Sequence, residues 1–205
     1  MKIGLLLGSF DPIHIAHINM ASCVLNSGLC DKIFFVVAKQ NPWKEKEPVG
    51  FELRCKMIEE AIKPFGNKCE VCKLEDTIEP PTYSYKVISL LLEQYKEDEL
   101  FLICGSDTID LVPQWRKFET HIKDKIGFIE IIRNSSTEIE NDTKPFIVRS
   151  CFRETLTNKE IWIIRMQKMD ASSTLVRAMI KNGMNPYPYV TENVFNIIQE
   201  YNLYK

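Results

Sequence analysis

Short, nearly continuous apolar runs alternate along most of this chain with segments whose apolar residues recur at helical spacing. Such runs are typical of strands buried on both faces of a sheet, and they occupy positions 3–7, 33–37, 100–104, 126–132 and 161–164, with an alternating run at 70–74. The helical segments lie between and after them, at 15–25, 53–62, 85–95, 173–181 and 191–200. Strands that alternate with helices of this length predict right-handed βαβ units and a parallel sheet.

This pattern predicts the α/β fold class: a Rossmann-like open parallel sheet with helices on both faces and a C-terminal helical element. The chain has 205 residues, enough for one well-buried domain, and we expect a single domain over 1–205. Two stretches fall outside the pattern. The stretch 41–50 carries two prolines and mixed charges and is expected to be a loop. The stretch 134–159 is polar and too long for a simple connection, so we expect a variable loop or a local extension there.

The charge balance bears on the partners of the protein. Lys and Arg number 26 against 28 for Asp and Glu, a formal charge of −2, whereas a nucleic-acid coat or a polybasic membrane anchor needs surplus positive charge. No apolar run approaches the roughly 20 residues that span a bilayer. We therefore expect no nucleic acid and no membrane as partner. Whether the protein forms a homo-oligomer stays open.

The cysteines indicate a reducing compartment. The chain has seven of them, and an odd number without an export signal favours free thiols over a disulfide framework. We therefore expect a cytoplasmic protein, with a nuclear location left open. Cys69 and Cys72 form one C-x-x-C pair, which is open to a zinc or redox interpretation. No second pair accompanies it and it lies in an alternating run, so we expect structural cysteines.

The first segment that carries chemistry follows the first predicted strand. In an open parallel sheet, ligands bind beyond the carboxyl ends of the strands, and the sequence there is Gly-Ser-Phe-Asp-Pro-Ile-His-Ile-Ala-His at 8–17. Gly8 permits a sharp turn and a close approach of ligand to backbone. His14 and His17 are three residues apart, so they face the same side of the entering helix. Two imidazoles beside free helix N–H groups predict a phosphate site; the alternative is one buried and one solvent-exposed histidine.

A second segment, at 170–177, reads Asp-Ala-Ser-Ser-Thr-Leu-Val-Arg and opens a predicted helix. Hydroxyl residues at a helix start are commonly N-caps, which explains one of the three. Arg177 lies four positions beyond Ser173 and three beyond Thr174, on the same helix face. Hydroxyls, unpaired N–H groups and a guanidinium on one face suit a polyphosphate.

Taken together, the two segments resemble the nucleotidylyltransferase superfamily. The run 8–17 is similar to its G-x-F-D-P-x-H-x-x-H signature, and 172–177 is similar to its closing S-S-T-x-x-R element. Two positions depart from the family pattern. Ala16 replaces the usual glycine between the histidines, and Ala171 replaces the isoleucine before the serines.

Within the superfamily the chain most closely resembles the nicotinate/nicotinamide mononucleotide adenylyltransferases of bacterial type, over essentially its whole length. Asn-Pro-Trp-Lys at 41–44 is similar to their N-P-P-H-K loop, and Pro-Thr-Tyr-Ser-Tyr at 81–85 is similar to their P-S-Y-T-x-D-T element. Gly-Ser-Asp at 105–107, followed by Trp115, resembles their G-x-D…W segment. Lys86 and Val87 stand where the second element has an acidic residue and a threonine.

The resemblance implies transfer of AMP from ATP to nicotinate mononucleotide, with nicotinamide mononucleotide as a second acceptor and Mg²⁺ accompanying ATP. It implies catalytic roles for His14, His17, Lys44 and Arg177. It implies ATP contacts for Gly8, Ser9, Phe10, Gly105, Asp107, Ser172, Ser173 and Thr174. It implies mononucleotide contacts for Thr82, Tyr83, Ser84, Trp115 and Arg133.

Plainer interpretations stay open for several of these residues. Asp107 follows an apolar run and would cap the next helix, Trp115 would belong to the core, and Lys44 would be one charge in a solvated run. Other functions also stay open: another nucleotidylyltransferase such as a phosphopantetheine adenylyltransferase, a non-catalytic nucleotide sensor, and a zinc-binding module formed through Cys69 and Cys72.

Overall fold

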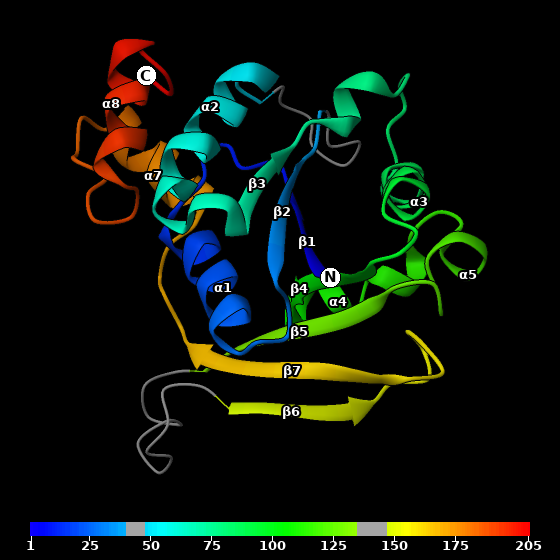
Figure 1. The fold of residues 1–205 in the computed structure, drawn as a ribbon. Coiled ribbons are helices and arrows are strands. Elements are labelled where there is room, and N and C mark those ends of the chain that lie inside the picture. The colour runs from blue at the N-terminus through cyan, green and yellow to red at the C-terminus, as the bar shows by residue number, and fades with distance from the viewer. Residues whose placement is uncertain (40–47, 135–146) are drawn as a thin grey trace.

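A seven-stranded sheet forms the centre of the protein, a computed structural model that describes residues 1–39, 48–134 and 147–205 (Figure 1). The strand order is β3-β2-β1-β4-β5-β7-β6. Neighbouring strands are parallel except β6, which pairs antiparallel with β7. The bounds are β1 Lys2–Gly8, β2 Lys32–Val37, β3 Cys69–Cys72, β4 Glu99–Gly105, β5 Gly127–Asn134, β6 Ile147–Phe152 and β7 Glu160–Gln167.

Helices cover both faces of this sheet (Figure 1). One face carries α1 Ile15–Asn26, α2 Phe51–Ile62, α7 Ser173–Lys181 and α8 Glu192–Glu200; the other carries α3 Ser84–Gln94, α4 Ser106–Ile109 and α5 Phe118–His121. Successive strand residues point to opposite faces, so Phe35 packs in the first core and its neighbour Phe34 in the second. The predicted Rossmann-like fold with helices on both faces is thereby confirmed, including the C-terminal helices.

Two regions contain structure that the sequence pattern did not predict. The polar stretch 134–159 includes β6, which extends the sheet by one antiparallel edge strand; residues 135–146 lie outside the described residues. Between β4 and β5 the chain forms the short helices α4 and α5 and the 3₁₀ turn η3, Val112–Gln114. Further 3₁₀ turns are η1 Lys63–Lys68 and η2 Leu74–Thr77. Pieces of three or four residues are too short to leave a periodic apolar pattern.

The C-x-x-C pair is split between the two sides of the sheet. Cys69 belongs to the core under α2, whereas Cys72 packs against the core under α3, as expected for strand residues an odd number apart. Burial raises the pKa of the Cys69 thiol to about 12. The two sulfurs therefore do not converge on one ligand, which argues against the zinc-binding interpretation and for structural cysteines. All seven cysteines are free thiols.

The strand order reverses direction between β1 and β4, because β2 lies on one side of β1 and β4 on the other. In open α/β sheets a crevice forms at the carboxyl ends of the strands at this switch point. Gly8 ends β1 and Gly105 ends β4, so the predicted turn at Gly8 and the segment that begins at Gly105 both open into that crevice. None of the described helices is both long and apolar enough to cross a membrane.

Candidate active site

A cavity of about 650 Å³ occupies the crevice at the carboxyl ends of β1 and β4. The residues that line it come from loops and helix starts far apart in the sequence. Those predicted as site residues from the sequence are Gly8, Ser9, His14, His17, Thr82, Tyr83, Ser84, Gly105, Asp107, Trp115, Arg133 and Ser172. The fold therefore brings both ends of the predicted ligand set, the phosphate residues and the mononucleotide residues, into one space.

Four predicted residues that the structure describes are not part of this lining. Lys44 lies outside the described residues. Phe10 is buried in the core, and Ser173, Thr174 and Arg177 sit at the start of α7, beside the loop that joins β1 to α1. The roles of all of these site residues remain predictions.

His14 and His17 form a stacked pair at the start of α1. Their ring centroids are 3.8 Å apart, and the backbone N–H of His14 donates to Nδ1 of His17 at 3.4 Å. Because Nδ1 of His17 accepts, the proton of that neutral ring is on Nε2. Nδ1 of His14 is buried and has no hydrogen-bond partner among the described residues. Both histidines line the cavity, so the pair stands where a bound ligand would meet it.

Both imidazoles are neutral at pH 7 in the unliganded protein. Burial, reinforced by the positive charge of Arg133, lowers the pKa of His14 from 6.5 to about 4. Burial also lowers the pKa of His17 well below its usual value, with further contributions from His14 and Arg133. Neutral imidazoles can donate one hydrogen bond each without first losing a proton.

The depressed pKa of His14 predicts acid sensitivity of the fold. Between pH 6.5 and 4 the unfolded chain binds a proton at this histidine and the folded protein does not, so the free energy of unfolding falls as the pH drops through that window. For His14 the loss amounts to about 3 kcal/mol. We expect urea unfolding of His14→Gln to show a smaller drop between pH 7 and pH 4 than the wild type. An identical drop in both proteins would contradict the burial of a neutral His14.

The loop between β1 and α1 has an unusual backbone at Phe10. Its φ of 46° is in the left-handed region, which is uncommon for a residue with a bulky side chain. This turn folds the phenyl ring back over Gly8, where a Cβ atom would lie only 3.0 Å from the ring. The ring meets His17 edge-on at a centroid distance of 4.9 Å. Phe10 therefore supports the histidine from the core side, and Gly8 is needed to make room for it.

The start of α7 is tied directly to that loop. The Ser173 hydroxyl donates to the Pro12 carbonyl at 2.9 Å, and Nη1 of Arg177 donates to the Asp11 carbonyl at 2.6 Å. Nη2 of Arg177 contacts Thr174 Oγ1 at 3.3 Å, which places these two on one helix face as their spacing predicts. The two segments that the sequence predicts to bind phosphate are therefore joined by direct hydrogen bonds.

Ser172 is the N-cap of α7, since its side chain accepts from the backbone N–H of Leu175 at 3.1 Å. Of the three hydroxyl residues at 172–174, this is the one that acts as the helix cap. Ser172 nevertheless lines the cavity, so the cap also places the N-terminus of α7 at the site.

An ion pair joins the ends of β4 and β5. Nη2 of Arg133 lies 2.9 Å from Oδ1 of Asp107. A Cβ atom at Gly105 would lie 2.7 Å from that same oxygen, so the glycine leaves space for the pair. Asp107 faces a cation at the cavity wall and does not act as the N-cap of α4, which is Gly105.

Another part of the cavity lining is aromatic and cationic. Tyr83 and Trp115 line it together with Arg116, whose guanidinium carbon is 4.8 Å from the Tyr83 ring centroid. Nη1 of Arg116 donates to the Tyr83 hydroxyl at 3.0 Å. Tyr83 is also the N-cap position of α3, and no side chain caps that helix. Arg116 was not predicted, because a single arginine after a tryptophan gives no pattern.

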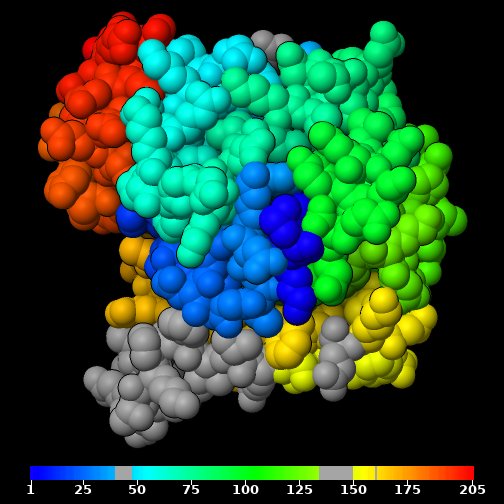
Figure 2. All heavy atoms as spheres, in the orientation of Figure 1, coloured from blue at the N-terminus to red at the C-terminus, as the bar shows by residue number. Residues whose placement is uncertain are grey.

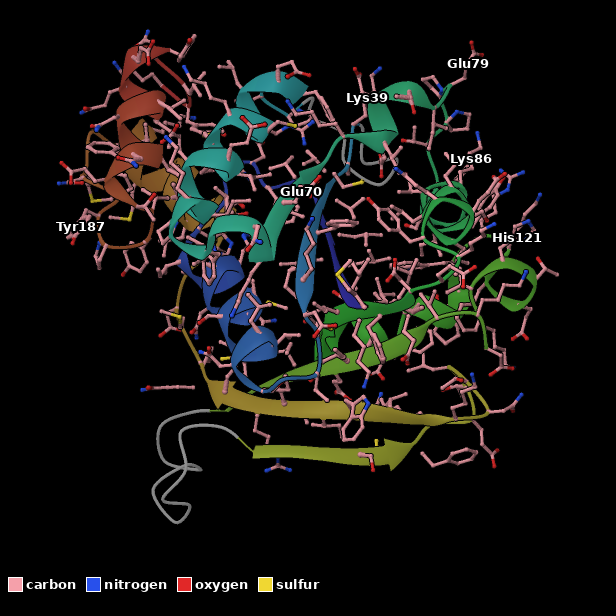
Figure 3. All side chains as sticks on the ribbon, in the orientation of Figure 1. Lys39, Glu70, Glu79, Lys86, His121 and Tyr187 are labelled. Carbon is pink, nitrogen blue, oxygen red and sulfur yellow. The ribbon has the colours of Figure 1, made fainter. Side chains whose placement is uncertain are left out.

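Lys86 does not take part in this wall. It lies on α3, and Glu79 precedes that helix (Figure 3). Its Nζ donates to the carbonyls of Glu79 at 3.3 Å and Pro81 at 3.0 Å. Lys86, at a position where the family has an acidic residue, therefore stabilises the segment 79–81 before α3.

Arg54 is a second residue that the sequence analysis missed. Its side chain is fully buried, and its guanidinium donates to four backbone carbonyls: Ser9 at 2.6 Å, Ala38 at 2.7 Å, Val49 at 2.7 Å and Lys39 at 3.1 Å. It joins the loops after β1 and β2 to the start of α2. A signal was present, since Arg54 falls on the apolar stripe of that helix, three residues before Met57.

Glu75 completes the cavity wall on the β2 side. This buried carboxylate accepts from the backbone N–H of Lys39 at 2.9 Å and from the Thr82 side chain. Burial raises its pKa. Glu75 thus links the loop after β2 to the segment that leads into α3.

Comparison with known proteins agrees with this geometry. The family model for cytidylyltransferase-like proteins matches residues 5–179. Two proteins each named "Probable nicotinate-nucleotide adenylyltransferase" are similar in sequence. The one from Methylacidiphilum infernorum is 31% identical over 99% of this chain and 92% of its own length. The one from Enterococcus faecalis is 30% identical over 100% of this chain and 85% of its own length.

A solved structure shares the fold. The nicotinic acid mononucleotide adenylyltransferase of Plasmodium falciparum, complexed with NaAD, superposes with a TM-score of 0.76 at 22% identity, covering 99% of this chain and 97% of that one. The family match and the sequence relatives each cover most of the chain and lead to one conclusion. This chain belongs to the cytidylyltransferase-like family and, within it, to the nicotinate-nucleotide adenylyltransferases.

Proposed function

We propose that this protein transfers AMP from ATP to nicotinate mononucleotide and releases pyrophosphate, forming the dinucleotide. The observation that carries the proposal is that the cavity at the β1–β4 switch point is lined both by the histidine pair and by Tyr83 and Trp115. Such a cavity is suited to two nucleotides whose phosphates meet beside the histidines.

The reaction joins two polyanions, so its main obstacles are repulsion and positioning. A 5′-phosphate oxygen of the mononucleotide attacks the α-phosphorus of ATP in line, the bond to the bridging oxygen breaks, and pyrophosphate leaves. The attacking oxygen is already negative at pH 7, so no residue has to remove a proton from it. His14 and His17 then act as hydrogen-bond donors to phosphate oxygens as charge develops, a role that their neutral state permits.

The remaining phosphate groups of ATP face the loop after β1 and the start of α7. The N-terminus of α7 offers backbone N–H groups and a positive dipole end, and Arg177 sits beside it with its side chain one-third exposed. Lys44 is proposed as a further phosphate ligand, from outside the described residues. Asp107 and Gly105, which line the cavity, are proposed to contact the adenosine of ATP.

We expect Mg²⁺ to accompany ATP, and the phosphate oxygens of ATP would hold the ion. The carboxylates that line the described cavity fit this arrangement, because both already have partners: Asp107 pairs with Arg133, and Glu75 accepts from Lys39 and Thr82. The ion would supply further neutralisation of the phosphate charge.

The α3 end of the cavity favours an acid over an amide on the pyridine ring. The first N–H groups of an uncapped helix bind a carboxylate well, and α3 begins at this wall without a side-chain cap. Arg116 adds a positive charge next to Tyr83. The first N–H groups of α3 and the Arg116 guanidinium can only donate, so they would offer no acceptor to the NH₂ group of an amide.

The test is turnover with each mononucleotide at the same ATP concentration, followed by pyrophosphate release. We expect kcat/KM for nicotinate mononucleotide to exceed that for nicotinamide mononucleotide by at least about tenfold, since loss of one paired polar group costs about 1.4 kcal/mol or more. Phosphopantetheine serves as the control acceptor and should give no pyrophosphate. Equal values for the two mononucleotides would overturn the acid preference, and turnover with phosphopantetheine alone would overturn the assignment.

A further inference from the structure

The carboxylate of Asp11, in the middle of the loop that joins β1 to α1, is fixed by hydrogen bonds. Its Oδ1 accepts from the hydroxyl of Tyr204 at 2.7 Å and from the backbone N–H of Val49 at 3.2 Å. Its Oδ2 lies 3.9 Å from Nη1 of Arg177, and its side chain is only 13% exposed. The shortest of these contacts comes from a residue 193 positions away in the sequence.

Tyr204 reaches this loop because of how the chain continues after α8. The backbone N–H of Leu203 bonds back to the carbonyl of Ile198 at 2.9 Å, and Tyr204 itself has a φ of 66°. This turn directs the chain back toward the molecule, and Tyr204 packs against the core beneath α2. Figure 2 shows α8 and the residues after it packed beside α2 at one corner of the molecule.

The bond between Tyr204 and Asp11 has a defined direction. Burial raises the pKa of the Tyr204 phenol well above its usual range, and the neighbouring Asp11 carboxylate raises it further. The phenol therefore stays protonated and donates, and the carboxylate accepts. Hydrogen bonds to an ionised acceptor are shorter and stronger than neutral ones.

The loop needs such support because its neighbouring residue is strained. A left-handed backbone at a bulky residue persists only where the surroundings hold it in place, and Phe10 is such a residue. Arg54 and Arg177 hold backbone carbonyls on either side of it. Tyr204 instead holds the Asp11 side chain, so it controls the orientation of the peptide that follows Phe10.

We propose that Tyr204 is a positioning residue, which acts through Asp11 to hold the loop 8–12 in the geometry that receives the phosphates of the nucleotide. The inference rests on the proposed function for the identity of that nucleotide. The relevant probe is ATP, because this loop and the adjoining histidines face its phosphates in the proposed reaction. A displacement of reacting groups by about 1 Å can lower a rate about 10²-fold.

The test compares Tyr204→Phe with Tyr201→Phe. Tyr201 lies in the same segment after α8 and its hydroxyl accepts from Nζ of Lys56 on α2 at 3.1 Å, but the residue is exposed. We expect Tyr204→Phe to lower kcat about 10-fold to 100-fold with little change in KM for the mononucleotide. Tyr201→Phe should keep both parameters. Wild-type kcat in Tyr204→Phe would overturn the proposal.

A double-mutant cycle separates this role from general support of the fold. In an Asp11→Ala background the acceptor is gone, so Tyr204→Phe should cause no further loss of kcat. The same fold-loss in both backgrounds would show that Tyr204 acts elsewhere. If Asp11→Ala does not fold, Asp11→Asn replaces it; there the neutral acceptor weakens the bond, and the effect of Tyr204→Phe should shrink.

Calorimetric binding of ATP without an acceptor distinguishes failure of this inference from failure of the proposed function. We expect Tyr204→Phe to weaken ATP binding about 5-fold to 10-fold, as loss of one well-placed bond does. If the wild type binds ATP but shows no turnover, and Tyr204→Phe binds ATP more weakly, the proposed reaction is overturned and the inference is kept. If the wild type turns over and Tyr204→Phe has unchanged ATP affinity and unchanged kcat, the inference is overturned and the proposed reaction is kept. No ATP binding by the wild type would overturn both.

Discussion

His17→Ala should lower kcat by about 10²-fold or more while the melting temperature changes little. The Nε2–H of His17 has no acceptor among the described residues, and its other nitrogen is held by the His14 backbone. In the proposed reaction that N–H is paired only when a phosphate oxygen is present, so its loss falls on the transition state. Steady-state kinetics with ATP and nicotinate mononucleotide measure the effect.

Two variants serve as controls for this prediction. His17→Gln keeps an N–H donor at a similar reach and should recover part of the rate. His121→Ala removes a histidine that packs edge-on against Tyr85 at the surface of α5 and should retain wild-type kcat. Near-normal turnover in folded His17→Ala would remove His17 from the proposed mechanism.

Arg54→Met should lower the free energy of unfolding by about 3–5 kcal/mol. The substitution keeps much of the side-chain volume but removes the donors to four backbone carbonyls. Each carbonyl left without a donor in the interior is destabilising by about 1–3 kcal/mol, and local rearrangement recovers part of the sum. Urea unfolding measures the change.

Lys56→Met is the matched control, because it makes the same kind of replacement two residues along the same helix at an exposed side chain. We expect a change within about 0.5 kcal/mol there. Arg54→Lys keeps the charge but cannot reproduce the planar set of donors, so its stability should fall between the wild type and Arg54→Met. A loss in Arg54→Met no larger than in Lys56→Met would contradict the role given to the buried guanidinium.

The parallel core of the fold could be predicted because its central strands β1, β2 and β4 are buried on both faces. A run such as Ile33–Val37 can be identified as a strand from its own residues alone, since continuous apolar character is typical of strands buried on both faces. The edge strand β6 lacks that signature. Its pairing with β7 gives it an extended structure, and the pairing depends on a neighbour that the local sequence does not reveal.

The site could be predicted in part, for a similar reason. His14, His17 and Ser172 lie in short local motifs at helix starts, and the fold brings them to one cavity. Ala16, where the family has glycine, lies inside the first turn of α1, so its methyl group meets no backbone constraint and favours the helix. Arg54 and Tyr204 act on the loop from distant positions, and only the tertiary structure shows those contacts.

The switch point between β1 and β4 has a thermodynamic consequence. The walls of the cavity come from segments around positions 8–17, 75–85, 103–116, 133 and 171–172, and only the folded sheet holds them together. A molecule that binds there has no equivalent site on the unfolded chain. By mass action it stabilises the native state by about 2.7 kcal/mol at a free concentration one hundred times its Kd, so the heat resistance of this protein reports directly on the occupancy of its cavity.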